Sequence, residues 1–378
     1  MKIYRIRYIS VCLGFFAILL ALNGAEAPPP ADDLFAQPKV LQIKIEIPPA
    51  SLDALKSDPR KYVRATLREG GVTLSDVGIR LKGNGAFPGL DKKPGLALKF
   101  NEYVSGQKFH IHSKLFLDNS HQDPSYLCEA LGGEIFRSLK VPAPRATFAR
   151  IELNGKDAGL YVVSEAVNRE FLSQYFKKSK GNLYEGNNSD ITDKLEKDAG
   201  DANKDQPDLK ALAAAAKTQD PNQRLTKLSA LLDVDRFIAF AAAETFTANH
   251  SGYCLARNNY RVYHDPVSNQ LVFIPHGLNH LFTNPKAPIQ PEWKGLIAKA
   301  LLDTPEGQRR YRDALTKLLA SGGKPETLNA RIADLAAKIR PAFGRDSNEA
   351  KSLESAVALL RERITERAKF IEQELSKK

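Results

Sequence analysis

Residues 249–280 read NHSGYCLARNNYRVYHDPVSNQLVFIPHGLNH, and they decide how the whole chain is interpreted. Two short runs of apolar and aromatic residues, Tyr260–Tyr263 and Leu271–Ile274, flank a turn at Asp265-Pro266. This is the pattern of a β-hairpin. On both sides of the stretch the chain is rich in Ala and Leu and has helical periodicity. The sequence therefore predicts a hairpin inserted in a helical region, with a polar loop at each end.

The N-terminal part of the chain has strand periodicity instead. Leu41, Ile43 and Ile45 alternate with polar residues, which indicates a half-buried strand. Further strand candidates lie at 63–67, 77–81, 96–100, 149–153 and 159–163, and one helical stretch lies near 125–139. We therefore predict an α+β protein with two lobes around a cleft. The β-rich N-terminal lobe takes residues 38–165, and the mainly helical C-terminal lobe with its inserted hairpin takes residues 166–378.

Length and composition exclude several classes of protein. The chain has 378 residues, of which 43% are hydrophobic and 26% charged. These values fit one large or two medium globular domains and exclude wholesale disorder, collagen-like repeats and a multi-span membrane protein. Three cysteines are too few for a disulfide scaffold, and no Cys/His array has zinc spacing. We expect neither zinc nor haem as a cofactor.

The first 27 residues have the layout of a secretory signal peptide. Basic residues precede an apolar run over 8–22, and Ala25-Glu26-Ala27 supplies small residues for cleavage. The run is shorter than the roughly 20 residues that span a bilayer, so an uncleaved anchor is the alternative. We expect a signal peptide over 1–27, a Pro-rich leader over 28–37, and no membrane span after cleavage. The protein is then exported, to the periplasm or to the extracellular cell surface.

Cysteine usage and charge bear on the compartment and the partners. Cys128 and Cys254 remain after cleavage, and we expect two buried thiols, with a disulfide as the alternative. The formal charge of +11, from 55 Lys and Arg against 44 Asp and Glu, permits contact with an anionic cell-surface partner or an unidentified protein. No run of five basic residues stands out, so we do not expect nucleic acid as a partner.

A Gly-rich turn, Gly83-Asn84-Gly85, follows the strand candidate at 77–81. Glycines in such a turn let backbone N–H groups approach a phosphate, and Lys92 or Lys93 on the next strand supplies a counter-charge. A plain hairpin turn explains the same residues.

Three glutamates are candidates to complete such a site. Glu129 and Glu134 lie on the helix that begins near Asp123, where either could pair with the strand lysine, as kinase-type enzymes require. A solvated helix face is the alternative for both. Glu165 ends the last strand of the β-rich part, where the lobes join.

The polar loops around the hairpin contain histidine and asparagine but no carboxylate except Asp265 in the turn. A magnesium site prefers at least one Asp or Glu. The histidine pairs 110/112 and 276/280 are too few for a metal site. Neither G-x-S-x-G nor H-E-x-x-H is present, so serine-hydrolase and zincin activities lack support.

In this order, the segments resemble the CotH (spore coat protein H) kinase-like family. The matching stretches, between about residues 40 and 290, are VGIRLKGNGAF, KKPGLALKF, KLFLDNSHQDPSYLCE, VPAPRATFARIELNGKDAGLYVVSE, GNLYEG, LLDVDRFIAF, NHSGYCLARNNYRVYHDP and LVFIPHGLNHLF. The resemblance implies a divergent bilobal protein-kinase fold, usually exported, that binds ATP with Mg²⁺ and, in active members, phosphorylates proteins. The nucleotide-binding residues that it implies are Gly83, Asn84, Gly85, Lys93, Glu129, Glu134 and Glu165.

The catalytic and metal positions depart from the family pattern. Ser251 stands where the family has an Asp before Gly-Tyr, and Asn279 stands where it has a metal-binding Asp after the hairpin. Gly277 also lacks a carboxylate, while Asn259 fills the metal-binding asparagine position. Serine cannot act as a base near neutral pH, and an amide binds Mg²⁺ far more weakly than a carboxylate. Removing such groups raises the barrier to phosphoryl transfer.

We therefore expect a pseudokinase with a binding or scaffolding role and a degenerate Mg²⁺-ATP site. The alternative is an active atypical ATP-dependent kinase, or a related transferase, that uses a relocated acid. Candidates for that acid are Asp265, Glu244 and the acidic segment 190–208.

Overall fold

The computed structural model describes residues 33–37, 39–83, 86–200, 205–344 and 347–377. The expected signal peptide over 1–27, residues 28–32 of the expected leader, Asn84 and Gly85 lie outside the described residues. The chain contains both helices and strands, so the predicted α+β class is confirmed.

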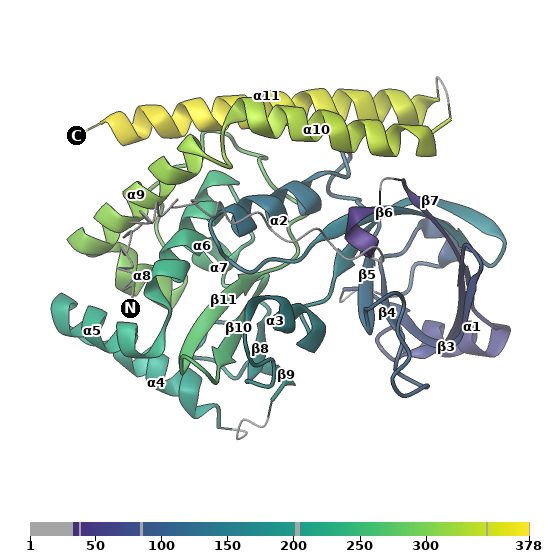
Figure 1. Cartoon of the computed structure of the whole chain (residues 1–378), viewed down its shortest axis with the longest axis horizontal. Coiled ribbons are helices and arrows are strands. Elements are labelled where there is room, and N and C mark those ends of the chain that lie inside the picture. Colours follow the sequence, from purple (N-terminus) through teal and green to yellow (C-terminus); the bar gives the residue numbers. More distant parts are fainter. Residues whose placement is uncertain (1–32, 38, 84–85, 201–204, 345–346, 378) are drawn as a thin grey trace, which may run out of the picture.

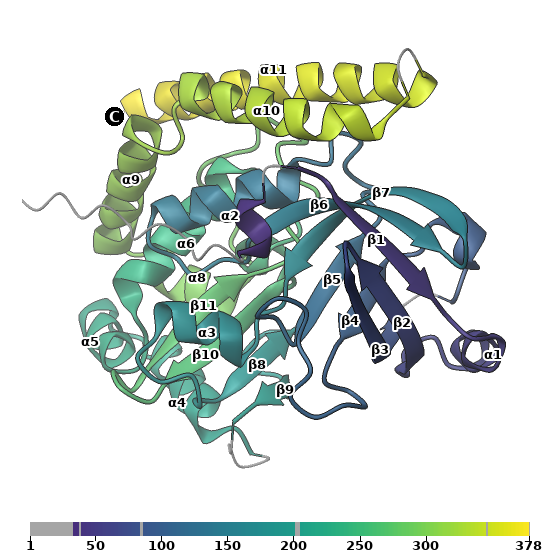
Figure 2. The same ribbon diagram turned by 45° about the vertical axis from the view of Figure 1, so that its right-hand side comes forward.

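Strands β1–β7 close into a barrel in the order β1-β2-β3-β4-β5-β7-β6 (Figures 1 and 2). β1 pairs with β6 in parallel, and the other neighbours are antiparallel. Residues of β1 are alternately buried and exposed, as its sequence predicts. The strands are β1 (Leu41–Glu46), β2 (Val63–Glu69), β3 (Val72–Leu81), β4 (Leu96–Lys99), β5 (Lys114–Asp118), β6 (Ala146–Leu153) and β7 (Lys156–Glu165).

Helices make up most of the remaining chain. Helix α1 (Pro49–Ser57) connects β1 to β2, and α2 (Cys128–Ser138) connects β5 to β6. The later helices are α3 (Arg169–Tyr175), α4 (Pro207–Ala216), α5 (Pro221–Leu231), α6 (Val234–Phe246), α7 (Tyr253–Ala256), α8 (Leu296–Leu302), α9 (Pro305–Ala320), α10 (Pro325–Ile339) and α11 (Asn348–Ser376). Within the described residues, no helix combines the length and the apolar character needed to cross a membrane.

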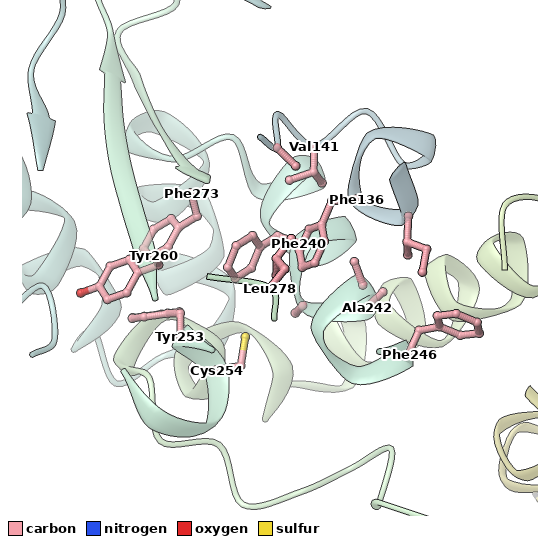
Figure 3. Close-up of a cluster of buried hydrophobic side chains, with 14 of the residues drawn as sticks. Phe136, Val141, Phe240, Ala242, Phe246, Tyr253, Cys254, Tyr260, Phe273 and Leu278 are labelled. Carbon is pink, nitrogen blue, oxygen red and sulfur yellow. The ribbon is translucent and has the colours of Figure 1, made fainter. Parts of the chain in front are cut away.

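The predicted hairpin is present as β10 (Tyr260–Asp265) and β11 (Gln270–Pro275). It is not isolated, because β8 (Leu183–Gly186) and β9 (Glu196–Ala199) extend it to a four-stranded sheet in the order β11-β10-β8-β9. Phe273 of β11 and Tyr260 of β10 pack with Phe240 of α6 in the large core of the helical part (Figure 3). The hairpin is therefore fixed on both sides, and the loops at its two ends start from rigid elements.

Strands β6 and β7 belong to two hydrophobic cores at once. Phe148 and Val162 face out of the barrel and pack in the core shared with the helices. Ile151 and Tyr161 point into the barrel core. Alternation of side chains along a strand produces this arrangement. The barrel and the helical part therefore share a wall.

Helices α10 and α11 form a long hairpin that lies across both the barrel and the helical part (Figures 1 and 2). Lys338 of α10 donates to the hydroxyl of Thr147 on β6 at 2.9 Å, and Arg331 forms an ion pair with Glu134 of α2 at 2.8 Å. Arg367 of α11 is fully buried and donates to backbone carbonyls at the end of α6 and in the segment 285–287. The C-terminal hairpin is thus bonded to both parts of the molecule.

Candidate functional site

The centre of the candidate site is an ion pair between Lys82 and Asp118. Lys82 directly follows β3, Asp118 ends β5, and Lys82 Nζ lies 2.5 Å from Asp118 Oδ2. The amide of Asn279 donates to the same oxygen at 3.2 Å, and the N–H of Ser120 donates to the other oxygen at 2.8 Å. Burial opposes ionisation of Asp118, but the charge and hydrogen bonds around it outweigh burial and hold its pKa below the usual value. Asp118 is therefore ionised and fully engaged.

Glu129 lies in the first turn of α2, close to this pair, and is nearly fully buried. Its Oε2 has no hydrogen-bond partner within the described residues. Burial raises the pKa of Glu129 to about 7, although the charge of Lys82 acts in the opposite direction. Glu129 is therefore half protonated near neutral pH. It is a second carboxyl group beside Lys82, whose ion pair is with Asp118.

Lys93, the lysine that the sequence suggested, lies elsewhere. Its Nζ donates to the hydroxyl of Tyr126 at 2.9 Å and lies over the rings of Tyr126 and Tyr161, 4.9 and 5.3 Å from their centroids. Burial lowers the pKa of Lys93 to about 8. Sequence reasoning missed Lys82, although it stands directly between the strand and Gly83 in the segment that was singled out.

Glu134 and Glu165 are held in ion pairs away from Lys82. Glu134 pairs with Arg331 of α10. Glu165, at the end of β7, accepts from the guanidinium of Arg145 at 2.9 and 3.2 Å and from Gln174 at 2.7 Å. The structure therefore brings Glu129 toward the lysine that follows β3, and leaves Glu134 and Glu165 in separate clusters. Gly83 follows Lys82 with φ of +95° and open space around it.

The loop before the hairpin is organised by a buried carboxyl group. Glu244 of α6 accepts from the backbone N–H groups of Tyr253 at 2.8 Å and Cys254 at 2.9 Å. A Cβ on Gly252 would lie 2.2 Å from Glu244 Oε1, so only glycine fits there. Ser251 Oγ donates to Asn249 Oδ1 at 3.2 Å. The loop is therefore rigid, and the Ser251 hydroxyl is turned toward an amide and not toward a base.

The loop after the hairpin is tied to the loop before it. The N–H of His276 donates to the carbonyl of Asn259 at 3.1 Å, and the side chain of Asn259 donates to Ser251 Oγ at 3.4 Å. Gly277, at φ of +63°, would bring a Cβ to 3.2 Å from the Asn259 side chain. Ser251 and Asn259 therefore lie together.

His276 links these loops to a buried ion-pair cluster on the small sheet. Glu185 of β8 and Asp198 of β9 both bind Arg261 of β10, at 3.0 and 2.8 Å. Burial, together with the charges of Arg261 and Lys82, lowers the pKa of His276 well below its usual value. The imidazole is therefore neutral, and its 3.6 Å approach to Glu185 is not an ion pair.

These donors do not fit Mg²⁺. In the part of the chain that the structure describes, no three His, Cys, Asp or Glu side chains group closely enough to hold a metal ion. Asn259 and Asn279 offer only amides, and the nearest carboxylate, Asp118, is already bound by Lys82. A hard cation prefers several carboxylate oxygens, whereas the unpartnered carboxyl group beside this pair, Glu129, is half protonated near neutral pH because it is buried.

The acids suggested as relocated catalysts are also engaged. Asp265 caps the hairpin turn through Ser268, and Glu244 holds the loop described above. Asp190 accepts from the hydroxyl of Tyr253 at 3.0 Å, and Asp208 accepts from Tyr184 and contacts His264. Each of these carboxylates has a structural role.

Cys128 and Cys254 are both buried and form no disulfide. Burial raises the pKa of both thiols well above the usual value, so neither is a reactive thiolate.

Comparison with known proteins gives relatives of low identity. The chain is 22% identical over 300 residues to the inner spore coat protein H of Bacillus subtilis, covering 72% of this chain and 82% of that protein. It is 24% identical over 190 residues to the invasin CotH3 of Rhizopus delemar, covering 45% of this chain and 32% of that protein.

Two solved structures are distantly similar. The Helicobacter pylori proinflammatory kinase CtkA matches with a TM-score of 0.34 and 10% identity over 71% of this chain and 92% of that one. The toxin–antitoxin system HipA, HipB and operator DNA complex of Shewanella oneidensis matches with a TM-score of 0.29 and 14% identity, over 93% of this chain and 75% of that one. Likenesses this low define no residue correspondence. The model of the CotH kinase protein family, in contrast, matches residues 79–375, and the chain belongs to that family.

Proposed function

We propose that this CotH-family chain is a bilobal kinase-fold protein that has lost phosphoryl transfer and acts by binding. The barrel would be the N-terminal lobe, and the helices with the β8–β11 sheet would be the C-terminal lobe. Membership of a family described as CotH kinase protein supports the kinase-like origin. The site residues support the loss of activity.

The observation that carries the proposal is the closed triad of Lys82, Asp118 and Asn279. A kinase uses a lysine to hold nucleotide phosphates and a carboxylate to hold the metal ion. Here the lysine charge is neutralised by Asp118, and the group at the metal position is an amide that donates to the same carboxylate. Both groups are therefore satisfied by the protein itself.

The loop with Ser251 supports the same conclusion. A base must be able to take a proton from the attacking hydroxyl at neutral pH. Ser251 has no such capacity, and its hydroxyl lies between the amides of Asn249 and Asn259. No step of phosphoryl transfer can be assigned to these residues.

An active atypical transferase is the second candidate, and one observation favours it. The carboxylate of Asp118 contacts Asn279, so it lies at the position where the family carboxylate is missing. If Asp118 released Lys82 on nucleotide binding, it would be a relocated acid. The protein would then still transfer phosphate, and activity would depend on Asp118.

We also propose an exported location. The N-terminal 27 residues have signal-peptide character, and the two relatives are described as a spore coat protein and an invasin. The proposed partner is a protein or an anionic polymer at the cell surface. Fractionation of cells expressing the full-length chain tests this, because a cytoplasmic protein that retains residues 1–27 would contradict it.

The test of the pseudokinase proposal is thermal unfolding with millimolar ATP, in matched samples with Mg²⁺, with Mn²⁺ and with EDTA. A ligand at 100 times its Kd stabilises the native state by about 2.7 kcal/mol. We expect no metal-dependent rise in the unfolding temperature. We also expect no transfer of label from γ-labelled ATP to the protein itself or to a basic protein acceptor.

Two variants give the experiment its controls. The double variant Ser251→Asp/Asn279→Asp restores both carboxylates and should gain metal-dependent stabilisation by ATP. Asp118→Asn separates the two candidates, because it should leave a pseudokinase inactive but abolish the activity of a transferase that uses Asp118. Label transfer by the wild type that disappears in both Lys82→Ala and Asp118→Asn would overturn the pseudokinase proposal.

A further inference from the structure

A pocket of about 250 Å³ lies beside the candidate site, below helix α11. Its walls come from the segment that leads into α2, from the loop after the hairpin, and from the side of α11 that carries Leu359 and Arg363. The pocket is smaller than the roughly 300–1,000 Å³ of sites for drug-sized ligands. It therefore has room for a small ligand only.

Four polar side chains in this pocket can donate hydrogen bonds and have no hydrogen-bond partner among the described residues; three of them can also accept, and Arg363 can only donate. Gln122, His280, Thr283 and Arg363 line it, and none of their side chains makes a hydrogen bond or an ion pair within the described residues. Arg363 is permanently charged and partly buried. Arg363 therefore lines a pocket in which the described residues provide it with no counter-ion.

The one carboxylate in the pocket wall is not available as that counter-ion. Asp123 is buried, and its oxygens accept from the hydroxyl and N–H of Ser125, at 2.5 and 3.0 Å, and from the N–H of Cys128 at 2.8 Å. These bonds hold the start of α2. Among the described residues, the pocket therefore presents one unpaired cation, and its only carboxylate is already engaged.

The remaining wall is apolar. Pro124, Leu281, Ala356, Leu359 and Leu360 line it, and Leu359 is 43% exposed although it is a large aliphatic residue. An apolar surface next to unpaired donors suits a ligand with an anionic head and a short apolar body.

We propose that this pocket binds a small oxyanion, a phosphate or carboxylate group on a compact apolar body, with Arg363 as the anchoring cation. Gln122, Thr283 and the neutral imidazole of His280 would donate to its other oxygens. The pocket shares Asn279 with the candidate site, but its cation comes from α11 and not from the end of β3. The proposal does not depend on whether the protein binds ATP.

The test is titration of the purified protein, without nucleotide or metal, with phenyl phosphate, benzoate, inorganic phosphate and neutral benzyl alcohol, by calorimetry and ligand-observed NMR. We expect the two aromatic anions to bind and benzyl alcohol to bind far more weakly. The tighter of the two anions distinguishes a phosphate from a carboxylate ligand. If benzyl alcohol binds equally well, the pocket is merely apolar and the proposal is overturned.

Variants locate the binding. Arg363→Gln should weaken phenyl phosphate or benzoate about tenfold or more, since a hydrogen bond to a charged group is lost. Arg361→Gln, on the exposed face of the same helix, is the matched control and should bind as the wild type does. Thr283→Val is a second pocket variant, in case Arg363→Gln fails to fold. Three outcomes would each refute the proposal. Folded Arg363→Gln could bind as tightly as the wild type, Lys82→Met alone could remove binding, or the wild type could fail to bind at millimolar concentrations.

Discussion

At Glu129, burial and a nearby cation act on the same carboxyl group in opposite directions. Burial prevails and raises its pKa to about 7. In the unfolded chain a glutamate ionises from about pH 4.3. As the pH rises, the unfolded state therefore loses this proton before the native state does. The contribution of Glu129 to the free energy of unfolding is fully present below about pH 4.3 and is lost as the pH rises to about 7. Above that pH the contribution of Glu129 is constant.

We predict that Glu129→Gln removes this part of the pH dependence. The variant should match the wild type near pH 4 and exceed its free energy of unfolding by up to ~3 kcal/mol at pH 8, since one pKa unit corresponds to about 1.4 kcal/mol. Denaturant unfolding at both pH values measures this. Glu244→Gln is the contrasting control: its two oxygens accept N–H groups, so the amide should destabilise the protein at both pH values. An equal effect of Glu129→Gln at pH 4 and pH 8 would contradict the assigned pKa.

Arg367 is a second residue whose environment makes a clear prediction. Its guanidinium is fully buried and bonds only to carbonyl groups, including that of Pro285 at 3.1 Å. Arg367→Met keeps much of the apolar volume but removes the donor to the carbonyls of Phe246, Pro285 and Ala287, each at about 1–3 kcal/mol. We predict a loss of at least ~3 kcal/mol in urea unfolding. Arg361→Met, on the exposed face of α11, is the control and should change the free energy of unfolding by about 0.5 kcal/mol or less. A similar loss in both variants would mean that the loss of side-chain volume, and not the loss of hydrogen bonds to the carbonyl groups, destabilises the protein.

At the scale of elements, helix α11 is held by one apolar side. Ile364 is fully buried in the large core, whereas Leu359 is 43% exposed. We predict that Ile364→Ala lowers the free energy of unfolding by about 2–5 kcal/mol, the usual cost of such a truncation in a core. Leu359→Ala is the matched control and should cost far less. Chemical denaturation followed by circular dichroism measures both, and equal losses would show that α11 lies differently against the core.

Elements were easier to predict than the contacts between them. Alternation in 41–47 predicted β1, and the two apolar runs with a turn predicted the β10–β11 hairpin, because these patterns are local. Strand β9 is exposed along most of its length and carries Glu196, Lys197 and Asp198, so it has no apolar pattern to reveal it. The family match to residue 375 likewise includes α10 and α11, beyond the region of the quoted motifs.

The candidate site shows why spatial partners were missed. The pairing of β3 with β4 and of β4 with β5 brings Lys82 and Asp118 to the same end of the barrel, although 36 positions separate them. No local pattern distinguishes Lys82 from Lys93, since both lie beside the same Gly-rich segment. Ser251 and Asn259 could be assigned from one stretch of sequence because they closely flank the short helix α7. The sequence could not distinguish Glu134 from Glu129, because what separates them is the ion pair of Glu134 with Arg331, which lies far away in the sequence on α10.

At the scale of the whole molecule, the shared wall of β6 and β7 has a consequence for unfolding. Phe148 packs with the helices, whereas Ile151, three residues later on the same strand, packs inside the barrel. Loss of the barrel core would therefore remove one side of the helical core as well. We expect the barrel and the helical part to unfold in a single cooperative transition, in contrast to two domains joined by a linker.

Thiol labelling tests this coupling directly. Cys254 is fully buried on α7, in the helical core, and Ile151 lies in the barrel core. Ile151→Ala should cost about 2–5 kcal/mol, and if unfolding is global it should increase the fraction of molecules that expose Cys254 about 30-fold or more. The measurement is the rate of Cys254 modification by a thiol reagent, followed by peptide mapping. Val72→Ala, at an exposed position on β3, is the control and should leave that rate unchanged. An unchanged Cys254 rate in a clearly destabilised Ile151→Ala protein would mean that the barrel opens by itself and that the two cores are energetically separate.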